Sequence, residues 1–266
     1  MSVRLERPAP GVVELVMDRP DALNAVSTAQ ARAIAAACAE VAGDETTQVV
    51  IVASALDRAF CVGADLKERA GLSDEELLAQ RPVSRAAYGA VLDLPMPTVA
   101  AVEGYALGGG CELALACDLI VAAESAVFGL PEVSVGLVPG GGGTQLLSRR
   151  IGLNRAADLV LTARRVEIDE ADRLGLVDRR VPTGTARPAA RQLAQQLAAN
   201  SPVALRNAKW ALRQGYDVDL PSGLVVEDQA WRRTAASADR VEGIAAFNDR
   251  RAPRWPGPPP GYAPRR

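Results

Sequence analysis

The feature that most constrains the fold is a repeated order of short apolar strand, glycine turn and apolar helix in the middle of the chain. The segment TVAAVEG (98–104) has the β-branched, apolar character of a buried strand. YALGGG (105–110) leads from it through glycines into CELALAC (111–117), which reads as a helix, and DLIVAAE (118–124) returns as a strand. Because strands that alternate with helices pack as a sheet covered by those helices, this order predicts an α/β fold.

The N-terminal segments extend this order. VRLER and VVELVMD, separated by PAPG, predict a hairpin of two strands over residues 3–18. Ser27 or Thr28 can cap the alanine-rich helix that follows. The run SDEE at 73–76 is a helix start signal, and it predicts a helix that ends near residue 93.

From about residue 187 onward the apolar residues recur at helical spacing only. The final stretch RRAPRWPGPPPGYAPRR (250–266) is Pro-rich and basic, which predicts an extended or disordered tail. The chain is therefore expected to divide into an α/β core that holds the active site (1–200), a helical C-terminal region (201–250) and a tail (251–266). Helices are expected at 187–199, 202–215, 221–236 and 239–248.

Composition and charge exclude several classes of function. Apolar residues make up 48% of the 266 residues and charged residues 23%, the balance of an ordinary globular protein. The net charge of −2 gives no overall positive field, so neither a nucleic acid nor a membrane is expected as a partner. No apolar run reaches the roughly 18 residues that a bilayer span needs, and the N-terminus has no apolar signal core, so a cytoplasmic protein is expected.

The chain contains no histidine, and this limits its catalytic chemistry. A Ser-His-Asp triad, a Cys-His dyad and a histidine-ligated zinc site are impossible. The four cysteines, Cys38, Cys61, Cys111 and Cys117, form no CxxC pair and lie among small apolar residues, as core cysteines do. Acid–base chemistry near neutral pH must therefore use carboxylates, lysine, tyrosine or cysteine.

Two glutamates lie in apolar sequence beside glycine loops. Glu112 falls in the first turn of the helix that follows Gly108-Gly109-Gly110, and Glu132 follows Pro131. Each has a structural explanation, because acidic residues are favoured in a first helical turn and Pro-Glu commonly begins a helix. Their joint placement beside glycine loops in a chain without histidine favours a catalytic role.

The glycine loops themselves suggest an anion site. Gly63-Ala64 ends a strand and Gly108–Gly110 begins a helix, so backbone N–H groups at both places can be free to bind an oxyanion. The alternative is that these glycines only make tight turns. The GGGC and GGGGT runs do not match GxGxxG, and no Gly-Lys-Ser/Thr is present, so dinucleotide binding is a weak alternative.

The segment GYALGGGCELALACDLIVAAESAVFGLPEVSVGLVPGGGGTQ resembles the signature region of the enoyl-CoA hydratase/isomerase (crotonase) family. RPDALNAV, FCVGADLKE and EGIAAFNDRR resemble its other landmarks, so the resemblance covers nearly the whole chain up to Arg251. It implies a crotonase-like spiral of ββα units with a C-terminal all-helical trimerisation region. It also implies an acyl-CoA substrate, no separate cofactor or metal, and a homotrimer or dimer of trimers.

The resemblance gives roles to individual residues. It makes the N–H groups of Ala64 and Gly109 the oxyanion hole for the thioester carbonyl, and it matches Glu112 and Glu132 to the two catalytic glutamates of the hydratases. Hydration of an unsaturated thioester needs a base for water, an acid for the α-carbon and stabilisation of the enolate. Apolar neighbours are expected to keep one glutamate neutral, and which one is the acid stays open. The resemblance places along coenzyme A the residues Ala22, Leu23, Ala64, Asp65, Leu66, Lys67 and Gly109, and, from a neighbouring subunit, Phe247 and Arg250.

The presence of both glutamates favours hydration over isomerisation. GADLKERAGLSDEE and LPEVSVGLVPGGGGTQ are similar to the methylglutaconyl-CoA hydratase branch, which acts in leucine breakdown and whose mammalian member also binds RNA through a lysine-rich helix. The corresponding AQARAIAAACAEVAGDE has one arginine and no lysine, so an RNA-binding, non-catalytic homologue is a remote alternative. The other alternative is a plain short-chain enoyl-CoA hydratase. Lys67, Arg69, Arg81 or Arg85 could hold a distal substrate carboxylate, although a solvated helix face is the simpler explanation.

Overall fold

The chain begins with the antiparallel hairpin that its sequence predicts. A computed structural model describes residues 2–259 and 262, and in it β1 (Val3–Ala9) pairs with β2 (Val12–Met17). Gly11 makes the turn at a φ of 73°, a value that favours glycine because glycine has no Cβ atom. β2 then pairs in parallel with the next strand of the same sheet, so the hairpin forms one edge of that sheet.

Strands of the described chain form two sheets. The remaining strands are β3 (Val49–Ser54), β4 (Ala59–Cys61), β5 (Thr98–Val102), β6 (Tyr105–Leu107), β7 (Leu119–Ala123), β8 (Val127–Gly129), β9 (Arg165–Glu167) and β10 (Arg179–Val181). The larger sheet has the order β1-β2-β3-β5-β7-β10 and is parallel beyond the hairpin. The smaller sheet has the order β4-β6-β8-β9, with β9 antiparallel to β8. The pairs β3–β4, β5–β6 and β7–β8 therefore each contribute one strand to each sheet.

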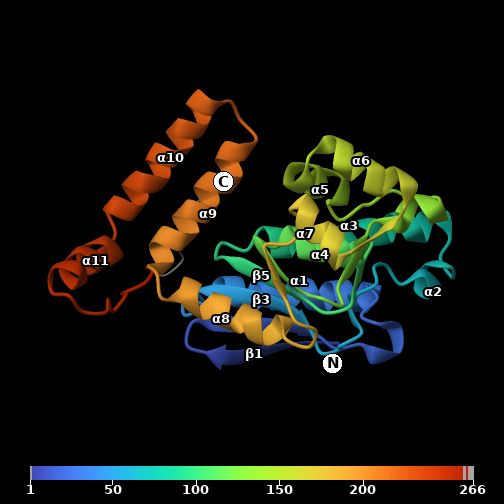
Figure 1. The fold of residues 1–266 in the computed structure, drawn as a ribbon, viewed down its shortest axis with the longest axis horizontal. Helices are drawn as coiled ribbons and strands as arrows, with labels where there is room; N and C mark the ends of the chain where they lie inside the picture. The colour runs from blue at the N-terminus through green and yellow to red at the C-terminus, as the bar shows by residue number, and fades with distance from the viewer. Residues whose placement is uncertain (1, 260–261, 263–266) are drawn as a thin grey trace.

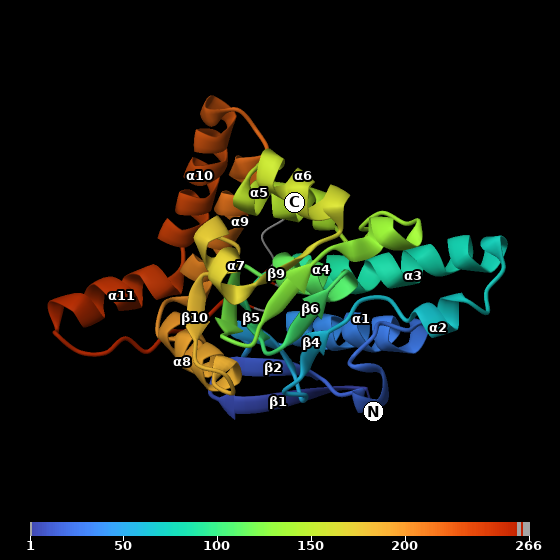
Figure 2. The same ribbon diagram turned by 45° about the vertical axis from the view of Figure 1, so that its right-hand side comes forward.

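Helices follow each pair of strands. They are η1 (Pro20–Ala22), α1 (Thr28–Gly43), α2 (Leu66–Arg69), α3 (Asp74–Leu92), α4 (Gly109–Ala116), η2 (Pro131–Val135), α5 (Gly143–Ile151), α6 (Leu153–Thr162), α7 (Ile168–Leu174) and α8 (Ala186–Ala198), where η marks a 3₁₀ helix. The hairpin is followed by α1, β3–β4 by α2 and α3, β5–β6 by α4, and β7–β8 by η2 and α5. This winding, visible in Figure 1 and Figure 2, is the spiral of ββα units that the family resemblance implies.

Both faces of the larger sheet are buried, which explains why its strands are apolar throughout. Val49, Ile51 and Ala53 of β3 lie in the cluster that α8 covers. Val50 and Val52, which point to the opposite face because side chains alternate along a strand, lie in the main core with α1 and α3. Figure 1 shows α8 lying along one face of the sheet. A continuous apolar run is the pattern expected for a parallel strand buried on both sides.

Three helices stand apart from the sheets at the C-terminal end: α9 (Pro202–Tyr216), α10 (Leu220–Ala235) and α11 (Ala238–Asn248). Together with α8 they match the four predicted C-terminal helices to within one residue at each end. Asp118, just before β7, ties α9 to the core by accepting hydrogen bonds from Lys209 (2.7 Å) and Arg213 (2.6 Å). The proposed boundary between core and helical region near residue 200 stays a prediction.

The described part of the tail is extended and packs back along the helical region. Trp255 donates its indole N–H to the carbonyl of Ala199 (2.9 Å), and the N–H of Gly257 donates to Asp239 (2.9 Å). Residues 251–259 form no helix or strand, and most of the remaining tail lies outside the described residues. In residues 2–259, no helix is both long and apolar enough to cross a membrane.

Candidate active site

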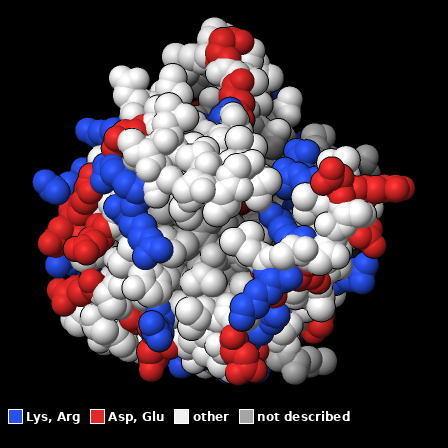
Figure 3. Space-filling view, turned by 90° about the vertical axis from the view of Figure 1, so that its right-hand side faces the viewer, with Lys and Arg blue, Asp and Glu red and all other residues white. Residues whose placement is uncertain are grey.

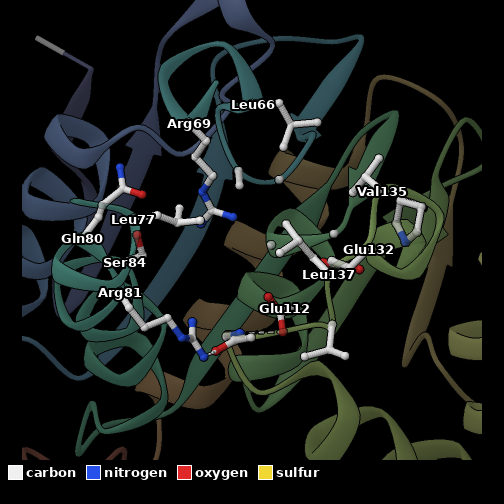
Figure 4. Close-up of a pocket in the computed structure, with 18 of the residues that line it drawn as sticks. Leu66, Arg69, Leu77, Gln80, Arg81, Ser84, Glu112, Glu132, Val135 and Leu137 are labelled. Carbon is white, nitrogen blue, oxygen red and sulfur yellow. Dashed lines mark hydrogen bonds between the residues drawn. The ribbon is translucent and has the colours of Figure 1, made fainter. Parts of the chain in front are cut away.

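A cavity of about 330 Å³ lies between α2 and α3 on one side and α4, η2 and the loop before α5 on the other. Five of the residues predicted for the site line it: Ala64, Leu66, Gly109, Glu112 and Glu132. Figure 4 shows Glu112 and Glu132 on one side of this cavity, with Arg69 and Arg81 extending toward them from the other. The structure thus brings together the two glutamates and both glycine loops, which are far apart in the sequence.

The glycines before α4 allow the close packing that forms the site. A Cβ atom at Gly110 would lie 1.9 Å from the carbonyl oxygen of Cys61, so only glycine lets α4 approach β4 this closely. Gly108 adopts a φ of 51°, and a Cβ atom there would lie 2.9 Å from a carboxylate oxygen of Glu132. A Cβ atom at Gly63 would lie 3.2 Å from the nitrogen of Gly109. The two glycine loops are therefore in contact, directly beside Glu132.

The predicted oxyanion donors, Ala64 and Gly109, have free N–H groups in this arrangement. The N–H of Val26 donates to the carbonyl of Gly63 (2.7 Å), and the N–H of Asp65 donates to the carbonyl of Val26 (3.1 Å). In such a parallel bridge the N–H of Ala64, between them, points the other way. Gly109 is the first residue of α4, where the N–H has no acceptor within the helix. Among the described residues neither N–H has a hydrogen-bond acceptor, so both remain available to a ligand in the cavity.

Glu112 is held in an environment that accepts its charge. Only 3% of the residue is exposed, and its Oε1 atom accepts hydrogen bonds from the N–H groups of Gly141 (2.6 Å) and Gly143 (2.7 Å). The pKa of Glu112 is raised, because burial outweighs the two N–H groups and the nearby charge of Arg81, which lower it. A Cβ atom at Gly143 would lie 2.9 Å from the same oxygen, so the glycines before α5 allow the loop to approach the carboxylate.

Glu132 lies in the opposite situation. It is the second residue of η2, and its Oε2 atom is buried with no hydrogen-bond partner in the described chain. Burial raises the pKa of Glu132 to about 7, and the charge of Glu112 acts in the same direction. Of the two carboxyl groups in the cavity, Glu112 is therefore the better stabilised as the anion, and Glu132 is the one favoured as the neutral acid near neutral pH.

The other predicted residues on the N-terminal side take several positions. Asp65 caps α2 by accepting the N–H groups of Lys67 and Glu68 (both 3.1 Å), and it pairs with Arg19 (2.7 Å). These contacts fix the loop that carries Ala64, so Asp65 has a structural role. Lys67, Ala22 and Leu23 lie outside the cavity wall. Leu23 accepts the N–H of Val62 (3.3 Å) and so adjoins the same loop.

Phe247 and Arg250 lie far from the cavity of their own chain. Both are at the end of α11, on the opposite side of the molecule from α2 and α3 (Figure 1). The side chain of Phe247 is 84% exposed. Only a neighbouring copy of the chain could bring these residues to a ligand, which is the role that the resemblance gives them.

Ser84 and Tyr88 are among the cavity residues that the sequence did not identify. Both lie on α3 and line the cavity one helical turn apart. The ring of Tyr88 lies against Gly141, and its hydroxyl lies against Gly109, since a Cβ atom at either glycine would come within 2.6 Å and 2.2 Å of them. The polar positions 80, 84 and 88 recur every four residues, and that spacing is the signal in the sequence that could have found them.

The cavity combines two carboxyl groups in different environments with two free N–H donors, on a spiral of ββα units. The chain belongs to the enoyl-CoA hydratase/isomerase family, whose sequence model matches residues 7–258. Two human relatives are each 40% identical over 257 residues, or 95% of this chain. One is enoyl-CoA hydratase domain-containing protein 2, mitochondrial, and the other is methylglutaconyl-CoA hydratase, mitochondrial, of which 88% and 76% are covered.

Solved structures have the same fold. A crystal structure of enoyl-CoA hydratase from Bacillus anthracis matches with a TM-score of 0.94 and 40% identity over 97% of this chain and 100% of that one. A crystal structure of enoyl-CoA hydratase from Mycobacterium tuberculosis H37Rv matches with a TM-score of 0.87 and 36% identity over 97% and 99%. The predicted crotonase-like α/β fold with C-terminal helices is thus confirmed.

Proposed function

We propose that this chain is an enoyl-CoA hydratase, which adds water across the double bond of an α,β-unsaturated acyl-CoA thioester. The observation that carries the proposal is the opposite environment of two carboxyl groups in one cavity, Glu112 holding two N–H bonds and Glu132 lacking a partner for its buried Oε2. Membership of the hydratase/isomerase family supports an acyl-CoA substrate. The reaction needs no metal or redox cofactor.

The environments support one assignment of the acid and the base, which the sequence left open. Glu112, favoured as the carboxylate, takes a proton from water while the oxygen of that water bonds to the β-carbon. The double-bond electrons move onto the thioester oxygen, and the N–H groups of Ala64 and Gly109 stabilise the resulting enolate. Glu132, favoured as the neutral acid, gives its proton to the α-carbon. A proton passing from Glu112 back to Glu132 then restores the starting state.

Substitution of each glutamate tests this assignment. Glu112→Gln and Glu132→Gln keep the side-chain shape but remove the base or the acid, so each is expected to lower kcat on crotonyl-CoA by about 10²–10⁴. Loss of enoyl-thioester absorbance measures the rate, and calorimetry with butyryl-CoA, which cannot be hydrated, checks that binding is kept. Glu124→Gln, at an exposed position after β7, is the matched control. Near-wild-type turnover in either variant at the cavity would contradict the proposal.

A second, narrower candidate is hydration of an acyl chain that ends in a carboxylate, as in methylglutaconyl-CoA. The observation that favours it is Arg69, whose guanidinium group faces the cavity and forms no ion pair or hydrogen bond within the described residues. Ser84 and Tyr88 add hydroxyl groups to the same wall, where a purely hydrocarbon chain would need apolar contacts. A relative named methylglutaconyl-CoA hydratase supports this candidate.

Arg69→Gln tests the narrower candidate through a ratio of two substrates. The wild-type protein is expected to prefer methylglutaconyl-CoA over crotonyl-CoA, and the variant to lose about tenfold or more of that preference, the value of a hydrogen bond to a charged group. The charge of Arg69 also lowers the pKa of Glu132, but this effect applies to both substrates and cancels in the ratio. A wild-type preference for crotonyl-CoA would contradict the narrower candidate and would indicate a general short-chain hydratase.

A further inference from the structure

Arg81 contacts the loop that holds Glu112. From the third turn of α3, its Nη2 atom donates to the carbonyl of Gly140 (2.6 Å). The next residue, Gly141, and then Gly143 donate their N–H groups to Glu112. Arg81, the glycine loop and Glu112 therefore form one continuous series of contacts, which Figure 4 shows along the lower edge of the cavity.

The loop depends on its neighbours for its shape. Residues 140–143 are four successive glycines, which have no side chains of their own to restrict the backbone, and Gly142 adopts a φ of 118°. The guanidinium of Arg81 lies close against the loop, because a Cβ atom at Gly140 would be only 2.7 Å from its Nη1 atom. The ring of Tyr88 lies equally close to the next glycine, Gly141, because a Cβ atom there would be 2.6 Å from the ring. Two side chains of α3 therefore hold the bare backbone in the conformation that presents its N–H groups.

Arg81 also brings a positive charge into contact with this loop. The titratable groups that act electrostatically with Glu112 are Arg81 and Tyr88 from α3, Glu132 from η2 and Cys111 beside it in α4. Arg81 is the cation among these, and it lowers the pKa of Glu112 against the effect of burial. No carboxylate among residues 2–259 and 262 forms a salt bridge with Arg81, so its charge is not neutralised within the chain.

We propose that Arg81 is a positioning residue for hydration: it fixes the glycine loop 140–143 so that two N–H groups hold Glu112, and its charge favours the ionised carboxylate that accepts the proton from water. The inference rests on the proposed role of Glu112 as the base. Arg81 acts through Glu112 and needs no contact with the reacting atoms. Its role is also distinct from that of Arg69, because Arg69 affects the choice of acyl chain and Arg81 affects acid–base chemistry on every substrate.

Variants at Arg81 separate its two contributions. Arg81→Gln removes the charge, so the acidic limb of the pH profile of kcat/KM should move to higher pH by about half to one unit, which lowers kcat/KM about three- to tenfold at pH values on that limb. Arg81→Lys keeps the positive charge, so the acidic limb of its pH profile should lie close to that of the wild type. The control is Arg155→Gln, at an exposed arginine of α6 that lies outside the cavity wall, and it should keep the wild-type profile.

A direct titration keeps the test independent of turnover. Carbon-13 NMR of the glutamate carboxyl groups, with the resonance of Glu112 assigned from its loss in Glu112→Gln, should show this group titrating at higher pH in Arg81→Gln than in the wild type. Equal titration in the two proteins overturns the inference, even if the wild type hydrates crotonyl-CoA. A shifted titration in a protein that does not hydrate enoyl-CoA supports the coupling and contradicts only the proposed function. A pH profile unchanged in Arg81→Gln also overturns the inference.

Discussion

At the scale of single residues, the site shows how two identical side chains acquire different chemistry. Both glutamates are buried, and burial alone would raise the pKa of each. Two backbone N–H groups donate hydrogen bonds to Glu112 and replace part of the hydration that it loses on burial, whereas Glu132 has a buried oxygen without a partner in the described chain. The difference comes from one loop of glycines, because a Cβ atom at Gly143 would lie 2.9 Å from the same oxygen and would hinder this approach of the loop.

The raised pKa of Glu132 predicts a cost in stability at alkaline pH. A carboxyl group with a higher pKa in the folded state than in the unfolded state contributes stability that is lost as pH rises through the folded value, here about 7. Glu132→Gln resembles the protonated form and cannot ionise. The variant should therefore match the wild type at pH 5 and be more stable at pH 8.5, by about 1–2 kcal/mol after allowance for partial exposure to solvent.

Thermal unfolding at a series of pH values measures this difference. Glu124→Gln, which changes an exposed carboxylate, should follow the wild-type curve throughout. If the curves for Glu132→Gln and wild type stay parallel from pH 5 to 8.5, Glu132 is ionised at neutral pH and cannot be the acid.

At the scale of elements, two helical glycines should respond in opposite ways to the same substitution. In α4, Gly110→Ala places a methyl group 1.9 Å from the backbone oxygen of Cys61, which cannot move without shifting β4. Destabilisation of roughly 3 kcal/mol or more is expected. In α3, Gly89→Ala meets no atom within 4 Å and should stabilise the chain by about 0.5–1 kcal/mol through its better helix propensity. Thermal unfolding of both variants checks the pair, and equal effects would contradict the packing described for α4.

The same scale shows what the sequence could predict. The start signal at 73–76 is confirmed: Ser73 and Glu76 form a capping box at the start of α3, with the N–H of Ser73 donating to Glu76 at 2.8 Å. Of the two possible caps for α1, Ser27 is the one that accepts a helix N–H. Such signals are local, because the residues that make them are a few positions apart.

Features that depend on distant partners were not predicted from the residues alone. The strands β6, β8 and β9 have three residues each, too few to show a period, and they form because they pair with one another across the smaller sheet. Glu112 was identified from its surroundings in sequence, but its hydrogen-bond donors lie 29 and 31 residues further along the chain. The family resemblance supplied the ββα spiral, whereas periodicity supplied only its longer elements.

At the scale of the whole molecule, charge and apolar surface are distributed very differently. On the face in Figure 3, basic and acidic side chains are interspersed around an uncharged centre, so this face offers no basic surface for a polyanion. The helices α9 to α11, by contrast, are anchored to the core through Asp118 and expose large apolar side chains. These include Leu212, Leu220, Leu224, Val225, Trp231, Ile244 and Phe247.

We propose that these helices form the interface of a homotrimer or dimer of trimers, because an exposed apolar patch of this extent usually marks an interface. Light scattering after size exclusion should give a mass three or six times that of the chain, and Trp231→Glu, at a side chain that is 68% exposed, should lower it. Circular dichroism checks that the helices remain. We also propose that Phe247 contacts the acyl-CoA of a neighbouring copy, as the family resemblance implies, so Phe247→Ala should raise KM for acyl-CoA with little change in kcat. A wild-type protein that is monomeric at micromolar concentration would contradict the interface. Equally tight binding of acyl-CoA by the wild type and the Phe247→Ala variant would contradict the shared binding site.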